Sequence, residues 1–387
     1  MEFLIGYINL LKTVLGSGIL YIPMLFKEYG VANAIIFLTI SCFLSISGLM
    51  MYAKCKDELK EENSNISTFS DYSYPFLGKV VDLFIVLKCF GVATTYLIII
   101  RDTIPRVLFQ MFKLEFLKSK KIGLIIFLMF IGPVTFFKKL NNLKYTSFLG
   151  VMAILLVILS SFYRFFTMTL VENRNVELFK PLNFSIFSGI GTFVFAFTCH
   201  QNLVTIQNEF RNKSLGRVYK LILLTMFSSF LVYFGFGFIN YYIFGDQLID
   251  NVLNNYPDDK LTDVMKVLYV FVMGFSYPLQ INPCRLYFKS LVGLNTRSTR
   301  NSLPLHIVLT AVLVVMTYSL AISGINLGVV YSFIGATAST MICLILPPVF
   351  YLKIRPNTKA YAKILGSIMI CSGFLIFFMM IYQNLKP

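Results

Sequence analysis

Long apolar stretches recur along the whole chain and are separated by short polar connections. A helix that spans a membrane needs about 20 mostly apolar residues. The connections are too short for a soluble domain, so we interpret residues 1–387 as a single transmembrane domain. The pattern predicts an all-α polytopic membrane protein with eleven transmembrane helices, at about residues 4–26, 31–53, 80–100, 121–137, 145–167, 186–207, 217–244, 262–288, 303–323, 326–352 and 361–383.

Five consecutive polar or titratable residues interrupt the sixth predicted span: Thr198, Cys199, His200, Gln201 and Asn202. In hydrocarbon an unpaired polar group costs several kcal/mol, so the cluster is expected to face protein, water or a ligand. Consecutive helical positions point around the full circle, and one packed face cannot cover all five. The cluster therefore favours a broken helix. His200 alone would more simply be a satisfied core histidine, but its neighbours make it a candidate ligand or proton carrier.

A second interruption, Gly16-Ser17-Gly18, lies in the first predicted span. One interpretation is a small-residue face that packs against a neighbouring helix. The other is an unwound segment, because two glycines lack the side chains that favour a helix. Its freed N–H groups and the dipole of the following helix would then bind a carboxylate. Two interrupted spans half a chain apart are typical of transporters that bind their substrate between them.

Two further features lie beside these interruptions. Lys12 is one turn before Gly16 and follows several apolar residues, so snorkelling to the interface is the weaker of two interpretations. A buried ammonium needs a partner or loses its proton, so Lys12 is a candidate for charge coupling. Ser276 lies near two prolines, Pro278 and Pro283, in the eighth span. Prolines free backbone carbonyls, so this stretch is either a kinked structural helix or a source of oxygen ligands.

Composition excludes several function classes. The chain is 57% hydrophobic and only 13% charged, against about 45–50% apolar residues in soluble domains. The net charge of +16 lies in short loops without a continuous basic patch, so we expect contact with the lipid bilayer and no nucleic acid. More than half of the 34 Lys and Arg fall on one side if the N-terminus is cytosolic. The seven cysteines have neither metal-ligand nor disulfide spacing, so we expect no bound metal and no cofactor. The spans contain no paired catalytic residues, so we do not expect an enzyme.

Four segments resemble the amino acid/auxin permease family. These are 9–20, 90–102, 195–202 and 275–280 with Pro283 and Arg285, which are similar to that family's first, third, sixth and eighth helices. The sixth-helix segment, Phe-Ala-Phe-Thr-Cys-His-Gln-Asn, most resembles the branch of sodium-coupled neutral amino acid transporters and fungal vacuolar amino acid transporters. The resemblance implies secondary transport of amino acids by alternating access, in a vacuolar, other endomembrane or plasma membrane.

The resemblance also implies a LeuT-like fold, in which five helices (about 4–167) are followed by an inverted repeat of five (about 186–352) and one extra helix (about 361–383). It places the substrate-binding site at two short segments. The backbone of the first span would hold the substrate's carboxylate and amine, and the sixth span would complete the site. The residues concerned are Val14, Leu15, Gly16, Ser17 and Gly18, with Phe197, Thr198 and Cys199.

Two departures from the sodium-coupled members concern the cation site. Those members have Asn where this chain has Lys12, and Thr where it has Ser276. An ammonium at this site could replace sodium, so we expect sodium-independent, proton-coupled transport or uniport. Lys12, Ser276 and His200 are the predicted coupling residues. The alternative is a membrane amino acid sensor that binds without significant flux. The short segment Met1-Glu2-Phe3 disfavours it, because we expect a sensor to engage a partner through a longer tail.

Overall fold

The computed structural model describes residues 2–62, 75–137, 143–168, 175–181, 186–210, 214–294 and 302–385. These residues form helices and connecting loops, with no β-strand among them. The fold is all-α, as predicted. The α-helices are α1 (Glu2–Leu15), α2 (Ile22–Tyr29), α3 (Val31–Glu62), α4 (Pro75–Phe112), α5 (Lys120–Thr135), α6 (Leu143–Thr167), α7 (Ile186–Ala196), α8 (His200–Glu209), α9 (Leu215–Phe244), α10 (Lys260–Leu291), α12 (Leu303–Ile322), α13 (Leu327–Ile334), α14 (Leu346–Ile354) and α15 (Ala360–Leu385).

Short helices of other types complete the chain. Two of them are π-helical and lie between α13 and α14, which the sequence pattern did not predict. π-Helical turns often occur at functional sites. The 3-10 helices are η1 (Gly18–Tyr21), η3 (Glu115–Lys118), η4 (Gly245–Gln247) and η5 (Val252–Asn254), and the π-helices are η6 (Gly335–Ser339) and η7 (Met341–Ile345).

Nine helical segments within the described residues are long and apolar enough to cross a membrane. They coincide with nine of the eleven predicted spans. The fourth predicted span corresponds to α5, which has only 16 residues, and the sixth is divided into α7 and α8, of 11 and 10 residues. The polytopic fold is therefore confirmed, whereas the count of eleven crossings is not, because one helix is short and another is interrupted.

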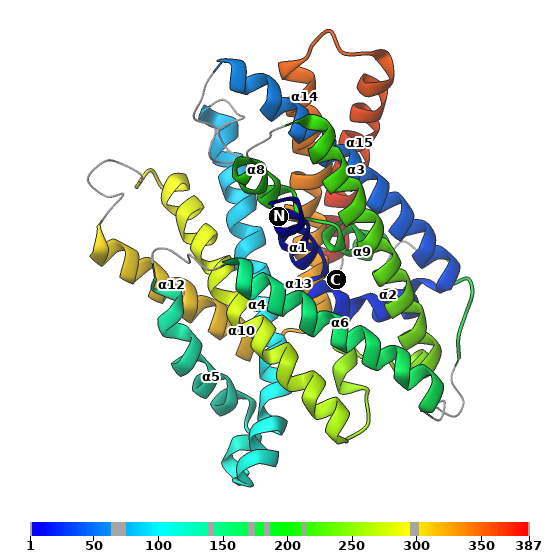
Figure 1. The fold of residues 1–387 in the computed structure, drawn as a ribbon, viewed down its shortest axis with the longest axis vertical. Helices are drawn as coiled ribbons and strands as arrows, with labels where there is room; N and C mark the ends of the chain where they lie inside the picture. Colours follow the sequence, from blue (N-terminus) through cyan, green and yellow to red (C-terminus); the bar gives the residue numbers. More distant parts are fainter. Residues whose placement is uncertain are drawn as a thin grey trace.

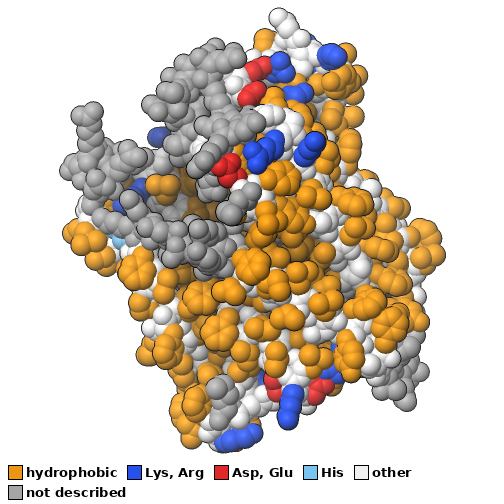
Figure 2. Space-filling view, viewed as in Figure 1, with side chains coloured by type: hydrophobic (Ala, Val, Ile, Leu, Met, Phe, Trp, Pro, Cys, Tyr) orange, Lys and Arg blue, Asp and Glu red, His pale blue; other side chains and the backbone are white. Residues whose placement is uncertain are grey.

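The surface has the polarity expected of a protein within a bilayer. In the face shown in Figure 2, apolar side chains cover the middle and charged side chains gather at the two ends. Large apolar residues such as Phe130, Met129 and Phe166 are 76%, 69% and 68% exposed. A soluble monomer rarely exposes so large an apolar surface. The protein is a multi-pass integral membrane protein.

Helix α1 lies in the middle of the bundle (Figure 1) and packs against α6 and α9. The long helices α4 and α10 pack along each other. We call the membrane side on which α1 begins the N-terminal side, and the opposite side the far side. Helix α10 continues as an α-helix through both of its prolines, Pro278 and Pro283, so these do not break the eighth predicted span.

Candidate functional site

Two helices are interrupted near the predicted positions, and of the predicted cluster 198–202 only Thr198 and Cys199 lie outside a helix. Helix α1 ends at Leu15, and the chain turns through Gly16 and Ser17 before η1 begins. Helix α7 ends at Ala196, and α8 begins only at His200. Gly16 and Gly18 do not have positive φ angles, so glycine is not needed there for its backbone freedom. What it supplies is space, because it has no side chain.

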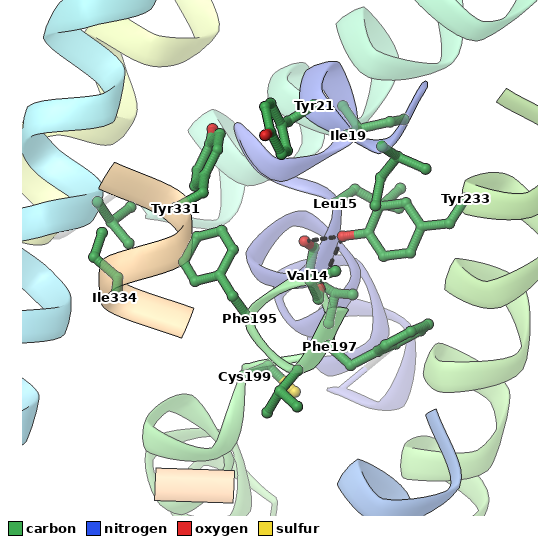
Figure 3. Close-up of a cluster of buried hydrophobic side chains, with 14 of the residues drawn as sticks. Val14, Leu15, Ile19, Tyr21, Phe195, Phe197, Cys199, Tyr233, Tyr331 and Ile334 are labelled. Atoms are coloured by element: carbon green, nitrogen blue, oxygen red, sulfur yellow. Dashed lines mark hydrogen bonds between the residues drawn. The ribbon is translucent and has the colours of Figure 1, made fainter. Parts of the chain in front are cut away.

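A single tyrosine on α9 connects the two interruptions. The Tyr233 hydroxyl lies 2.5 Å from the carbonyl oxygen of Val14 and 2.9 Å from that of Ala196 (Figure 3). Both carbonyls lie at the end of an interrupted helix, where the usual partner four residues on is lost. A hydroxyl has one proton to donate, so the two carbonyls share it. Tyr233 is fully buried, and the aromatic ring of Phe197 packs against its own at 5.4 Å.

Other side chains donate to two further carbonyls of the interruptions. The Tyr269 hydroxyl of α10 donates to the oxygen of Gly16 at 2.6 Å. The Lys88 ammonium of α4 donates to the oxygen of Thr198 at 3.2 Å. In a membrane interior, irregular backbone persists only where protein or a cavity satisfies it. Side chains of α4, α9 and α10 therefore stabilise the non-helical backbone of the two interruptions.

Two adjoining cavities lie at the interruptions. The smaller, of about 20 Å³, is bounded by both broken segments together with α4 and α10. The larger, of about 320 Å³, extends from Gly16 toward the N-terminal side. They share five lining residues, Thr13, Gly16, Tyr96, Gln201 and Gln280. The larger volume is in the range of small-molecule sites, whereas the smaller holds about one water molecule.

The structure divides the eight predicted substrate-binding residues into two groups. Five line the smaller cavity, namely Val14, Gly16, Ser17, Gly18 and Thr198. The other three, Leu15, Phe197 and Cys199, do not line either cavity and are at most 1% exposed in the apolar cluster behind the interruptions (Figure 3). These three contribute packing around the interruptions.

The three predicted coupling residues are not all together. Lys12 and Ser276 both line the larger cavity. The Lys12 side chain lies along α6, where a Cβ at Gly150 would be 2.8 Å from its Cε. His200 lines neither cavity. Its Nδ1 lies 3.2 Å from the sulfur of Cys343, and its ring packs against Tyr52 on the side of α3.

Several residues in the cavities or behind the interruptions were not predicted to belong to the site. They include Lys88 and Tyr96 of α4 and Gln280 of α10 in the cavity lining, and Tyr233 and Tyr269, which line neither cavity. Lys88 carried a signal in the sequence, because a lysine within a span is a functional candidate by default. The tyrosines carried none, because the chain has 22 of them and only contacts across helices distinguish these two.

An aromatic layer closes the site on the far side. The rings of Phe195 and Tyr331 lie 5.0 Å apart, and those of Tyr331 and Tyr21 lie 5.5 Å apart (Figure 3). Phe195 also lines the smaller cavity. Since the larger cavity lies on the opposite side, the protein is closed toward the far side and hollowed toward the N-terminal side.

Ion pairs join the helices at the far end. Arg164 of α6 pairs with Asp259, and Arg106 of α4 pairs with Asp258 and lies 3.8 Å from Asp263. The hydrogen bond from Arg164 lowers the pKa of Asp259 from its usual 3.8 to about 2. A carboxylate with a lowered pKa stabilises the fold above its usual pKa, and this contribution is lost as the pH falls toward 2. The pair therefore remains charged at mildly acidic pH.

We expect Tyr233→Phe to lower the free energy of unfolding by about 1–3 kcal/mol, because it leaves a buried carbonyl without its donor. Transport should fall as well, because both interruptions lose their common contact. Thermal unfolding of the purified protein in detergent measures the first effect, and uptake by proteoliposomes measures the second. Tyr163→Phe on α6, where the side chain is 57% exposed, is the matched control and should change neither. An unchanged Tyr233→Phe protein would contradict the role given to this hydroxyl.

A membrane bundle with two broken helices facing a cavity is the architecture of secondary transporters. Solved structures share this LeuT-like fold. A manganese transporter of Eremococcus coleocola aligns with a TM-score of 0.61 at 9% identity, over 100% of this chain and 88% of its own. A nucleobase-cation-symport-1 family transporter in a closed conformation also aligns with a TM-score of 0.61, at 13% identity, over 98% of this chain and 90% of its own.

The chain belongs to the family of transmembrane amino acid transporter proteins, whose model matches residues 2–386. It is 31% identical to vacuolar amino acid transporter 5 of Schizosaccharomyces pombe over 90% of this chain and 84% of that protein. It is 27% identical to vacuolar amino acid transporter 6 of Saccharomyces cerevisiae, over 96% and 94%. Sodium-coupled neutral amino acid symporter 2 of Danio rerio is 23% identical over 97% and 80%. The family and these relatives are transporters, not enzymes, and the resemblance drawn from the sequence is confirmed.

Proposed function

We propose that the protein is a secondary active transporter that moves amino acids by alternating access, independently of sodium and coupled to protons. The observation that carries this proposal is the pair of facing helix interruptions, which bound one cavity and adjoin a larger one. The similarity to two vacuolar amino acid transporters supports a vacuolar or other endomembrane location. The charge bias of the loops supports a cytosolic N-terminus, so the larger cavity would open to the cytosol.

The interruption of α1 offers the groups that an amino acid needs. The N–H groups at the start of η1 and the hydroxyl of Ser17 would bind the carboxylate, as helix N-termini bind anions. The Gln201 side-chain oxygen, which is buried and has no hydrogen-bond partner among the described residues, would accept from the ammonium. A cavity of about 20 Å³ is too small for an amino acid, so the site must widen as the substrate enters from the larger cavity.

Coupling is assigned to Lys12 and Ser276. Both line the larger cavity beside Gly16, at the positions where the sodium-coupled relatives are expected to hold their cation. Burial disfavours the charged form of a lysine, whereas nearby oxygens favour it. Lys12 would therefore bind and release a proton as the repeats, residues 4–167 and 186–352, move against each other. His200 is a weaker candidate for carrying a proton, because it faces α3 rather than a cavity.

We expect wild-type uptake in sodium-free buffer and its stimulation by an inward proton gradient. Lys12→Asn should reduce proton-driven uptake to the level measured without a gradient, because it removes the titrating group. Combined with Ser276→Thr, it should introduce stimulation by sodium, since it restores the side chains of the sodium-coupled members. Labelled amino acid uptake into proteoliposomes, with sodium and pH gradients set independently, measures both effects.

The control for this experiment is His200→Gln, which should keep both the rate and the pH profile. A wild type that requires sodium, or a Lys12→Asn variant with full proton-driven uptake, would rule out the coupling proposal. A counterflow experiment, which measures exchange of labelled amino acid across the membrane, distinguishes a transporter from a sensor. A purified protein that binds amino acids without exchanging labelled substrate across the membrane would be a sensor and not a transporter.

A further inference from the structure

Lys88 is a buried charge that lines the smaller cavity. It lies on α4 and is 3% exposed. Val92 and Tyr96 follow it at intervals of four residues and line the same cavity, so all three share one face of the helix. The opposite wall is the interruption at Gly16, Ser17 and Gly18. An amino acid held by that interruption would have this face of α4 within reach of its side chain.

The charge of Lys88 has no counter-charge among the described residues. Its hydrogen bond goes to the neutral carbonyl of Thr198, at 3.2 Å. Within the described parts of the chain, no carboxylate forms an ion pair with it. Its titratable neighbours include the thiols of Cys89, Cys199 and Cys343 and the imidazole of His200. An ammonium buried in a membrane protein is costly unless it is paired, and such residues usually mark the path of a substrate or ion.

A purely structural role does not account for a charged side chain at this position. A carbonyl at a helix interruption needs one donor, and a neutral hydroxyl supplies it at Val14 and at Gly16. A neutral donor would cost less to bury than an ammonium. Lys88 has further protons to donate beyond its contact with Thr198. The residue is therefore suited to bind an anion that enters the cavity.

We propose that Lys88 selects amino acids with an acidic side chain, such as glutamate and aspartate, by pairing with their second carboxylate. This inference rests on the proposed transport function and names its substrate class. The α-carboxylate would bind at the interruption of α1, and the side-chain carboxylate would lie against Lys88. Lys12 does not compete for this role, because it lines only the larger cavity. Binding would bring to Lys88 the counter-charge that the described residues lack.

Glutamate and glutamine test this proposal, because they have nearly the same shape and differ in the side-chain charge. Wild-type protein in proteoliposomes should take up labelled glutamate with a higher kcat/KM than glutamine. Lys88→Met removes the charge and keeps most of the side chain's length. It should lower the glutamate-to-glutamine ratio on the order of 100-fold, as expected when one partner of a buried charge pair is removed. Lys88→Arg should retain a preference for glutamate.

The matched control is Lys54→Met, because Lys54 lies in the C-terminal half of α3 against the ring of Tyr351 and lines neither cavity. It should leave the ratio unchanged. A wild type that prefers glutamine, or a Lys88→Met variant that loses both substrates equally, would overturn the proposal and leave Lys88 with the bracing of Thr198 alone. If Lys88→Met does not reach the membrane, the glutamate-to-glutamine ratios of the wild type and of Lys88→Arg test the proposal instead.

The failure of this inference can be distinguished from the failure of the proposed transport function. The second readout is the thermal stability of the purified protein, which needs no flux. Glutamate should raise the melting temperature more than glutamine in the wild type, and this difference should disappear in Lys88→Met. If glutamate stabilises the protein but is not taken up, the role of Lys88 in binding acidic side chains is supported and the transport function is rejected. If both amino acids are taken up equally well, the transport function is supported and the selective role of Lys88 is rejected.

Discussion

Uptake by Gly18→Leu protein is expected to fall to the background of liposomes without protein, although the variant still reaches its membrane. A Cβ at Gly18 would lie 3.5 Å from the Phe195 ring and 3.9 Å from the Tyr233 hydroxyl, which are ordinary contacts. The remaining carbons of leucine would have to enter the cavity of about 20 Å³ beside it. They would occupy the space that the substrate carboxylate needs. Gly16→Leu should have the same effect, because Gly16 lines both cavities.

The alanine variants at the same positions are the matched controls. A Cβ at Gly16 would lie 3.5 Å from the carbonyl oxygen of Thr13, and none of its contacts is closer than that. Since neither glycine has a positive φ, alanine causes no backbone strain there. Gly16→Ala and Gly18→Ala should therefore fold and retain much of the wild-type uptake. Normal uptake by both leucine variants would remove the interruption of α1 from the substrate site.

A second large effect is expected at Gly335, where the π-helix η6 approaches α7. A Cβ at Gly335 would lie 2.3 Å from the carbonyl oxygen of Gly191, and one at Gly191 would lie 2.4 Å from the nitrogen of Ala336. These are backbone atoms, which cannot rotate away as a side chain can. Gly335→Ala should lower the free energy of unfolding by about 3 kcal/mol or more. The melting temperature in detergent should fall by roughly 5 °C.

The control for this prediction is Gly235→Ala on α9. A Cβ at Gly235 would meet no atom within 4 Å, so it tests the same substitution without the steric conflict. That variant should melt within about one degree of the wild type or slightly higher, because alanine favours the helix. If Gly335→Ala melts like Gly235→Ala, the close contact between η6 and α7 does not hold in the protein.

The hydrophobic pattern predicted the fold class because it follows directly from the bilayer. Each crossing must be long and apolar, and each polar interruption must be covered, whatever its neighbours are. The interruption at 16–18 and one within 198–202 were therefore visible in the sequence, although residues 200–202 turned out to be helical. The pattern left open whether Pro278 and Pro283 only kink the eighth span or provide oxygen ligands, and the structure shows that α10 continues through both. The pattern did not predict the π-helices η6 and η7, which have the composition of an ordinary span.

The sequence alone determined the multi-pass architecture, the two interruptions and the family that they resemble, because these features are encoded in consecutive residues. The tertiary structure decided which residues around the interruptions share a cavity. It placed Lys88 beside Gly16 and Ser17, and it placed His200 against α3 instead. A helix presents its residues in all directions, and only packing against other helices decides which direction faces the cavity. For that reason the sequence predicted the two interruptions, whereas the place of Lys88 in the cavity beside them came only from the structure.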